Sequence, residues 1–375
     1  MALPTTVVRG RQATAVRWLP LAFGCGLLAH VVIAFICASA PEGHLGDFHR
    51  YRELAAAPGR PYTDFAAEYP PGALTVFEAI SGVARSPRFF DAALLGLNVL
   101  ADLAIVALLA SVWGLESAAC FTLIGIPILS LLYFRMDLWS MAAVTAAVAL
   151  WFRRRPYSSA AALWAGAALK LWPIPFVALF AAGARRGRLG PFAAIAVGGA
   201  ISASAWIWMS GTSGAMQVLT FRGASGWDIE SSIGSVLHAM TALPLRLESG
   251  AVRVGWNHPA ISVALFLIAA PVALWAIYAG AILGRLGTGW VAGIGALLAC
   301  SALLSPQFLG WLLPGAAIAW AEDDRETTAW VAALVAVTIL YRVLHTQTVP
   351  GLVLVRNVML VVTTMQAFTT LRSSR

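Results

Sequence analysis

Residues 19–40 read LPLAFGCGLLAHVVIAFICASA, an apolar run long enough to cross a membrane as one helix. The run is too long for the core of a signal peptide, and no good cleavage site follows it, so we expect a spanning helix that is retained. Similar runs recur along the 375-residue chain, which is 60% hydrophobic and only 11% charged, with a mean hydropathy of +0.79. This composition predicts an all-α polytopic membrane protein that forms a single domain over residues 1–375.

The positive charge predicts how the helices are oriented. The formal net charge is +8, and arginines cluster beside the apolar runs at residues 9–17, 153–155, 185–188 and 372–375. Such clusters mark cytoplasmic loops. We therefore expect about ten to twelve transmembrane helices, cytoplasmic N- and C-termini, and large outer loops at about 40–88 and 211–257. Nucleic-acid binding is not expected, because no water-exposed basic face is predicted.

Two segments allow more than one topology. Residues 69–83 fit a short helix lying on the membrane surface, started sharply by Pro70 and Pro71, or alternatively a short span. Residues 158–183 are broken at Trp172-Pro173-Ile174-Pro175 and have basic clusters on both sides. They fit a tight hairpin of two short helices with Lys170 near its tip.

The unusual polar residues gather, by this topology, at the outer ends of the helices and in the two outer loops. They include Asp47, His49, Glu68, Arg135, Asp137, Arg222, Asp228, Glu230, His258, Gln307, His345 and Arg356. A membrane protein that keeps titratable groups at the mouth of its helices is usually handling a polar substrate there. No HExxH, P-loop, GxSxG or zinc-type spacing occurs, and the four cysteines have no CxxC pattern, so neither a metal nor a cofactor is expected.

Several of these residues have both a functional and a structural interpretation. Asp47, in a partly desolvated outer loop, fits a general base, or else a solvated acid or helix N-cap. Glu68 could bind sugar hydroxyls or orient His49, or it could simply favour the start of a helix. Arg222, in RGASGWDIES, suits a phosphate group, or forms an ordinary salt bridge within its loop.

The cations inside apolar segments have alternatives too. Lys170 needs a buried partner or a phosphate, or it extends toward the headgroups. Arg356, in LVLVRNVML, is harder to explain as an interfacial residue. His345 alone fits an interfacial histidine. Aromatic rings of the kind that stack on sugars occur at Tyr69, Trp227 and Trp311.

An ordered set of motifs resembles one enzyme family. The motifs are GDFHRY, Y-x-DF-x-x-EYPPGA, LKLWP, RG-x-x-x-WDIES and LSPQFLGWLLP, and the similarity as a whole runs from about residue 44 to 357. In this order they are similar to the polyprenyl-phosphate-mannose-dependent mannosyltransferases, glycosyltransferase family eighty-seven of the C-type superfamily. One departure is SPQFLGW, which has Gln307 and Trp311 where the phosphatidylinositol-mannoside branch has a histidine pair. The acceptor therefore stays open.

The resemblance implies a C-type glycosyltransferase-like bundle whose long first outer loop carries surface helices. It also implies a catalytic aspartate matching Asp47, a polyprenyl-phosphate sugar donor with mannose as the expected hexose, and inverting, metal-independent transfer to a lipid or glycan acceptor at the outer face of the cell membrane. We expect Arg222, Arg356 or Lys170 to neutralise the leaving phosphate. The alternatives are a flippase for lipid-linked sugars and a non-catalytic membrane assembly factor.

Overall fold

The computed structural model describes residues 15–40, 47–185, 187, 189–344 and 350–374, and this part of the chain is mostly helical. Seven helical runs within it are long and apolar enough to cross a membrane, which confirms the expected multi-pass class: α1 (Ala15–Ala38), α4 (Pro87–Trp113), α5–η1–α6 (Leu115–Gly125, Ile126–Ile128, Leu129–Tyr133), α10 (Leu189–Leu219), α12 (Pro259–Leu283), α15 (Arg325–Val343) and α16 (Pro350–Ser373). Four further apolar helical runs are shorter: α3 (Pro71–Val83), α7 (Asp137–Phe152), η2–α9 (Ile174–Val177, Ala178–Ala184) and α13 (Leu286–Ala299). The number of spans, ten to twelve, therefore stays a prediction.

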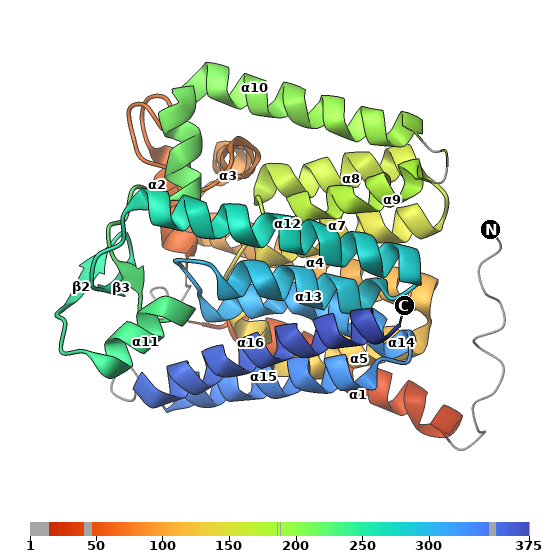
Figure 1. Cartoon of the computed structure of the whole chain (residues 1–375). Coiled ribbons are helices and arrows are strands. Elements are labelled where there is room, and N and C mark those ends of the chain that lie inside the picture. Colours follow the sequence, from red (N-terminus) through yellow and green to blue (C-terminus); the bar gives the residue numbers. More distant parts are fainter. Residues whose placement is uncertain (1–14, 41–46, 186, 188, 345–349, 375) are drawn as a thin grey trace.

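The long helices run side by side, and the two ends of the bundle differ (Figure 1). One end carries α2 (Phe48–Ala56) and a small sheet, whereas α1 begins and α16 ends at the other. The segment 158–183 is a hairpin, as expected: α8 (Pro156–Leu169) leads to Lys170, and η2 and α9 return the chain. The turn between α7 and α8, with Arg153 to Arg155, and the end of α9, with Arg185, thus lie at the end where α1 begins. The membrane side of that end stays a prediction.

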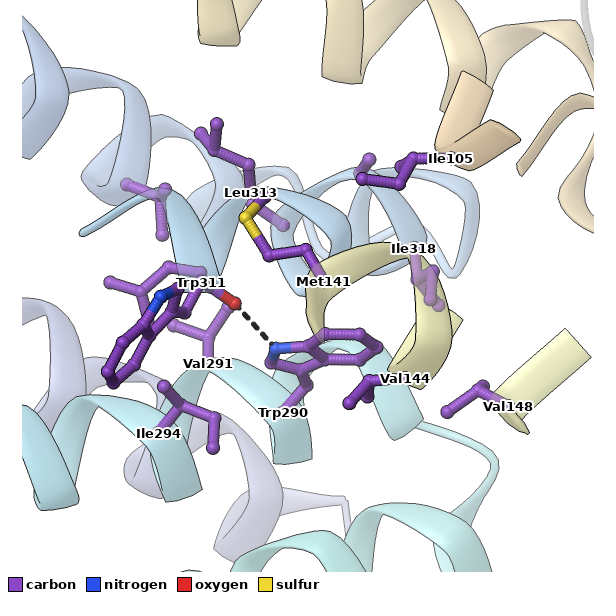
Figure 2. Close-up of a cluster of buried hydrophobic side chains, with 14 of the residues drawn as sticks. Ile105, Met141, Val144, Val148, Trp290, Val291, Ile294, Trp311, Leu313 and Ile318 are labelled. Carbon is purple, nitrogen blue, oxygen red and sulfur yellow. Dashed lines mark hydrogen bonds between the residues drawn. The ribbon is translucent and has the colours of Figure 1, made fainter. Parts of the chain in front are cut away.

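The centre of the bundle is built on α13, whose residues are almost all buried. A Cβ atom added at Gly287 would lie 2.1 Å from the backbone nitrogen of Ala319, so glycine allows α13 and α14 (Leu313–Ala321) to approach closely. Trp290, also on α13, donates a 2.7 Å hydrogen bond from Nε1 to the backbone oxygen of Trp311 (Figure 2). This bond joins the core to η3 (Pro306–Leu312), which carries functional candidates.

The first outer loop carries two helices, as expected. Pro71 is the first residue of α3, so the two prolines do start a helix. Figure 1 shows α3 almost end-on, crosswise to the long helices. Whether this helix lies on the membrane surface or spans the membrane stays a prediction. Gly72 lets it approach α8 closely, because an added Cβ would lie 2.7 Å from the backbone oxygen of Ala168.

The second outer loop differs from the all-α expectation. Helix α10 continues past residue 211 through a kink at Gly211, whose φ is +67°, and ends at Leu219. The loop then forms β1 (Trp227–Asp228), α11 (Ser232–Met240), β2 (Leu245–Glu248) and β3 (Ala251–Val254). The strands make a three-stranded antiparallel sheet in the order β1-β3-β2. Sequence patterns missed it because its strands are only two to four residues long.

Two apolar helical segments change from one helix type to another along their length. The segment 117–133 is divided at Ile126–Ile128 by a 3-10 turn around Pro127, and the segment 307–321 begins as η3 before it becomes α14. Proline cannot donate the backbone hydrogen bond that a continuous α-helix requires. The break in the second segment places a polar and aromatic turn beside α7.

Candidate functional site

A buried ion pair lies where the hairpin meets α7. Lys170 caps α8 and donates a 2.6 Å hydrogen bond from Nζ to Oδ1 of Asp137, the first residue of α7. Trp311 of η3 donates from Nε1 to the same oxygen, also at 2.6 Å. The side chain of Asp137 is only 1% exposed. Three residues that the sequence identified separately therefore form one cluster.

Aromatic rings surround the ammonium group of this cluster. Nζ of Lys170 lies 4.7 Å from the ring centre of Phe308 and 5.2 Å from that of Trp311. Trp172 stacks on Trp311, with ring centres 5.0 Å apart and planes 10° apart. Cation–π contacts help to hold a lysine away from water. The arrangement argues against the alternative in which Lys170 extends to the headgroups.

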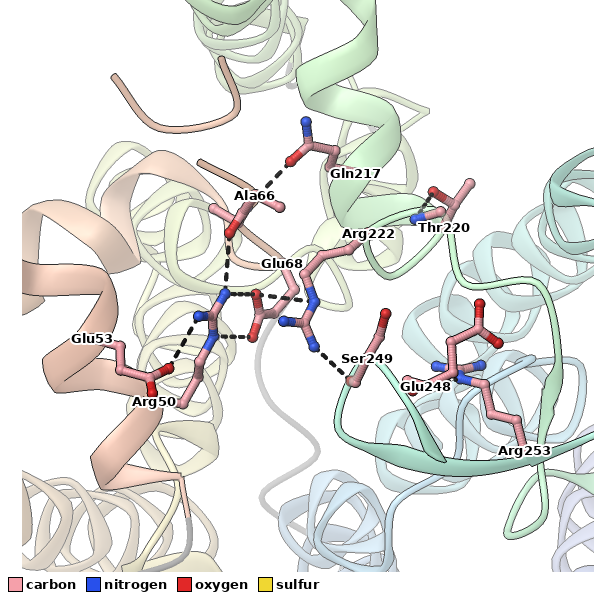
Figure 3. Close-up of polar contacts among 12 residues, drawn as sticks. Arg50, Glu53, Ala66, Glu68, Gln217, Thr220, Arg222, Glu248, Ser249 and Arg253 are labelled. Carbon is pink, nitrogen blue, oxygen red and sulfur yellow. Dashed lines mark hydrogen bonds and ion pairs between the residues drawn. The ribbon is translucent and has the colours of Figure 1, made fainter. Parts of the chain in front are cut away.

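A second polar cluster is centred on Glu68, which is 8% exposed (Figure 3). Arg50 donates from Nε and Nη2 to the two carboxylate oxygens of Glu68, each at 3.0 Å. Arg222 completes the cluster: its Nε lies 3.6 Å from Oε2 of Glu68, and its Nη2 donates to the backbone oxygen of Ser249 at 2.5 Å. Glu68 thus joins the first outer loop to the second.

This geometry corrects two expectations. Glu68 does not orient His49, whose side chain is 74% exposed and pairs with Glu53 at 3.1 Å. Arg222 forms a salt bridge, but with Glu68 of the other loop and not with the acids of its own motif. Its charge is thus already balanced in part.

Asp47 pairs with Arg135, and the charge of Arg135 also interacts with Asp137 of the lysine cluster. Asp47 occupies the N-cap position of α2 but makes no capping hydrogen bond, and its carboxylate instead pairs with Arg135. Burial lowers the pKa of Arg135 to about 10, although nearby Asp137 and Glu230 oppose that shift. With a side chain 31% exposed, Asp47 remains open to a ligand. The N-cap alternative is therefore wrong for the side chain.

A cavity of about 290 Å³ lies beside these clusters. Its polar lining includes Glu68, Lys170, Arg253 and Asn257, while one wall is formed by apolar side chains of α12 such as Val263 and Phe266. Phe266 is 42% exposed, so this wall reaches the lipid-facing surface. The cavity fits a ligand with a polar head and an apolar chain.

Arg253 was not identified from the sequence, although it lines this cavity. Its side chain comes from β3 and is 2% exposed, and Nη2 has no hydrogen-bond partner among the described residues. Oδ1 of Asn257 is likewise buried and unpaired in that part of the chain. The only sequence signal was an arginine in the apolar stretch AVRV.

Other sequence candidates belong to a separate cluster. Arg356 of α16 is fully buried and donates to the backbone oxygen of Glu230. Glu230 also accepts a 2.6 Å hydrogen bond from the hydroxyl of Tyr341. This cluster ties the second outer loop to α15 and α16. Arg356 does not line the cavity, so its expected contact with a donor phosphate is not supported.

The remaining candidates are buried or lie outside the described residues. Trp227 is 5% exposed in a small core with Ile229 and Val254, and Tyr69 packs its ring edge-on against Tyr51 and Phe77. Neither ring is presented for stacking on a sugar. Gln307 is 6% exposed in η3. His345 lies outside the described residues.

Asp228, next to Trp227, is the most perturbed carboxylate of the second outer loop. It is 3% exposed, and its two oxygens accept from the backbone nitrogens of Glu230, at 3.1 Å, and Leu304, at 3.2 Å. Burial raises the pKa of Asp228 to about 7, with a further contribution from the nearby charge of Glu230. Asp228 is therefore only partly ionised at neutral pH.

Comparisons of the sequence with protein-family models and with curated proteins gave no match. Among the described residues, no group of three or more His, Cys, Asp or Glu side chains is arranged to hold a metal ion.

Proposed function

We propose that this protein is a membrane glycosyltransferase of the C-type fold that uses a polyprenyl-phosphate hexose, with mannose as the expected sugar. The observation that carries the proposal is the cavity of about 290 Å³, whose polar end contains Lys170 and whose apolar wall on α12 reaches the lipid-facing surface. A polyprenyl phosphate has the same division between an anionic head and a long apolar chain. The donor would be bound from the outer half of the membrane.

Asp47 is the proposed general base. It takes the proton of an acceptor hydroxyl, whose oxygen attacks the anomeric carbon of the donor. The bond between that carbon and the phosphate oxygen breaks, and polyprenyl phosphate leaves with the bonding electrons, so the configuration inverts. The ion pair with Arg135 favours the ionised carboxylate, the form that a base requires. Lys170 stabilises the charge that develops on the leaving phosphate.

A second cavity supports a lipid-borne acceptor. It measures about 870 Å³, lies between α1 and α4, and is lined mainly by apolar side chains. Phe48 lines it, and Asp47 is the preceding residue. An acceptor whose chains occupied this groove would bring its headgroup to the proposed base.

Transfer assays with defined donors test the proposal. Purified protein in detergent is incubated with an acceptor lipid extract and with either a short-chain polyprenyl-phosphate hexose or a nucleotide sugar, each with and without a chelator. We expect a glycolipid product from the prenyl donor only, unchanged by chelation. Transfer from the nucleotide sugar, or dependence on a divalent ion, would contradict the proposal.

The same protein in proteoliposomes distinguishes the alternatives. Movement of the prenyl-linked sugar across the bilayer without a new glycosidic bond would indicate a flippase. Absence of both movement and transfer, with a glycolipid defect in a deletion strain that Asp47→Asn still complements, would indicate an assembly factor. Neither outcome is compatible with Asp47 acting as a catalytic base.

A further inference from the structure

Arg253 is a buried cation without an acidic partner in the described part of the chain. Its Nε donates to the backbone oxygen of Glu248 at 3.2 Å, and its Nη1 donates to that of Gly226 at 2.8 Å. Both acceptors are neutral carbonyls. Its guanidinium carbon lies 5.7 Å from the ring centre of Phe221. Nη2 has no hydrogen-bond partner among the described residues, so it is a buried donor of a charged group that nothing in that part of the chain satisfies.

The nearest acids favour the charged arginine without a direct bond to Nη2. The carboxylate of Glu248 accepts from the backbone nitrogen and the hydroxyl of Ser225, at 2.7 and 3.0 Å, and its charge acts on Arg253 from a greater distance. Asp228 is close enough to favour the charged arginine, yet its own pKa of about 7 leaves it partly neutral. Burial lowers the pKa of Arg253, because removing the guanidinium from water disfavours its charged form.

Of the three charged residues that line the cavity, Lys170 and Arg253 are basic and Glu68 is acidic. Lys170 is balanced by Asp137, and Glu68 is shared between Arg50 and Arg222. Arg253 comes from β3 of the second outer loop and adds a positive charge to the lining (Figure 3). Buried charged groups are normally hydrogen-bonded, so an anion in this cavity would supply the partner that Nη2 lacks.

We propose that Arg253 is the residue that binds the phosphate of a lipid-linked ligand in this cavity. Nη2 donates to a phosphate oxygen, and Oδ1 of Asn257 accepts from a hydroxyl of the group attached to that phosphate. The chain of the ligand lies along α12, past Val263 and Phe266. The identification of this ligand as the sugar donor rests on the proposed function, whereas the anion site itself does not.

Direct binding measurements test the site independently of sugar transfer. Purified protein in detergent is titrated with farnesyl phosphate, farnesol and inorganic phosphate, and tryptophan fluorescence reports binding. Arg253→Gln should raise the dissociation constant for farnesyl phosphate about tenfold or more and leave that for farnesol unchanged. Arg246→Gln is the matched control, because Arg246 is opposite Arg253 in the β2–β3 register but is exposed.

A second variant covers a failure of Arg253→Gln to fold. Asn257→Asp changes few atoms and places a negative charge on the cavity wall, so it should weaken farnesyl phosphate binding and spare farnesol. Wild-type affinity for farnesyl phosphate in a folded Arg253→Gln protein, or in Asn257→Asp, would overturn the proposal. Binding of inorganic phosphate as tight as that of farnesyl phosphate would overturn its lipid-linked part.

The results also separate this site from the proposed function. If wild-type protein binds farnesyl phosphate through Arg253 but transfers no sugar, the anion site stands and the glycosyltransferase proposal fails. If Arg253→Gln transfers sugar with an unchanged KM for the prenyl donor, the glycosyltransferase proposal stands and the assignment of Arg253 to the donor phosphate fails.

Discussion

Asp137 and Lys170, which are 33 residues apart in the chain, form a buried ion pair in which one carboxylate oxygen also accepts from the indole nitrogen of Trp311. The pair joins the start of α7 to the tip of the α8–α9 hairpin and to η3. Because Lys170 also lines the cavity, the same contact that fixes these three elements sets the position of its ammonium group.

The pair is expected to behave as a unit in stability measurements. Lys170→Met should lower the melting temperature strongly in detergent, because it leaves the carboxylate of Asp137 buried without its cation, a loss of about 3–5 kcal/mol. The double variant Lys170→Met/Asp137→Asn should recover part of that loss. Equal melting temperatures for the single and the double variant would mean that the two side chains are not coupled.

Asp47→Asn should fold normally and lose sugar transfer by a factor on the order of a hundred or more, because an amide cannot accept the proton of the acceptor hydroxyl. Asp64→Asn is the matched control: Asp64 is an exposed carboxylate of the same outer loop that accepts from the backbone nitrogen of Arg60 at 2.7 Å. Initial rates at saturating donor provide the measurement. Transfer by Asp47→Asn at a rate close to that of Asp64→Asn would remove Asp47 from the mechanism.

Asp228 predicts a pH dependence of stability. Its pKa in the folded protein, about 7, is above the ordinary value of 3.8, so the folded state holds the proton more tightly than the unfolded state does. The stability that this provides is fully present below about pH 4 and is lost as the pH rises through 7. Between pH 5 and 8, the free energy of unfolding of wild type should therefore fall relative to Asp228→Asn, by up to about 3 kcal/mol.

Melting curves of the two proteins at pH 5 and pH 8 check this expectation. Glu326→Gln, at an exposed position near the start of α15, serves as the control for loss of a carboxylate. A constant difference between wild type and Asp228→Asn across the range would show that Asp228 does not titrate there.

Arg356 should matter for stability and not for the donor. Arg356→Met removes the hydrogen bond to the backbone oxygen of Glu230, which joins α16 to the second outer loop, and the bonds to neighbouring Asn357. We expect a loss of about 2 kcal/mol or more, with the KM for the donor unchanged in the folded fraction. Arg372→Gln, exposed on the same helix, is the control. A raised KM for the donor without a change in stability would indicate that Arg356 does contact the donor phosphate.

Topology can be tested by cysteine labelling in intact cells. Suitable sites for single cysteines are Arg60, between α2 and α3, and Leu247, in β2, because α2 and the sheet lie at one end of the bundle. Arg154, between α7 and α8, and Arg185, directly after α9, are the sites for the opposite end. With the four native cysteines replaced by serine, an impermeant reagent should modify positions 60 and 247 only. Modification of position 154 or 185 from outside would reverse the assigned orientation.

The sequence alone determined the features that depend on local composition. Apolar runs predict spanning helices wherever they occur, arginine clusters predict which ends share a side, and Pro70-Pro71 predicts the start of α3. The hairpin with Lys170 at its tip follows from the same reasoning. Each of these inferences needs only neighbouring residues, so it could be made before the structure was known.

Only the tertiary structure decided which polar groups meet. Glu68 and Arg222 are 154 positions apart, and nothing local distinguishes their pairing from a salt bridge inside either loop. The small sheet was missed because its strands are too short to show a pattern, and Arg253 was missed with it. Partners of buried charges are set by packing between distant segments. A single cation can therefore be recognised in the sequence, but whether it is paired or free to bind an anion depends on the whole fold.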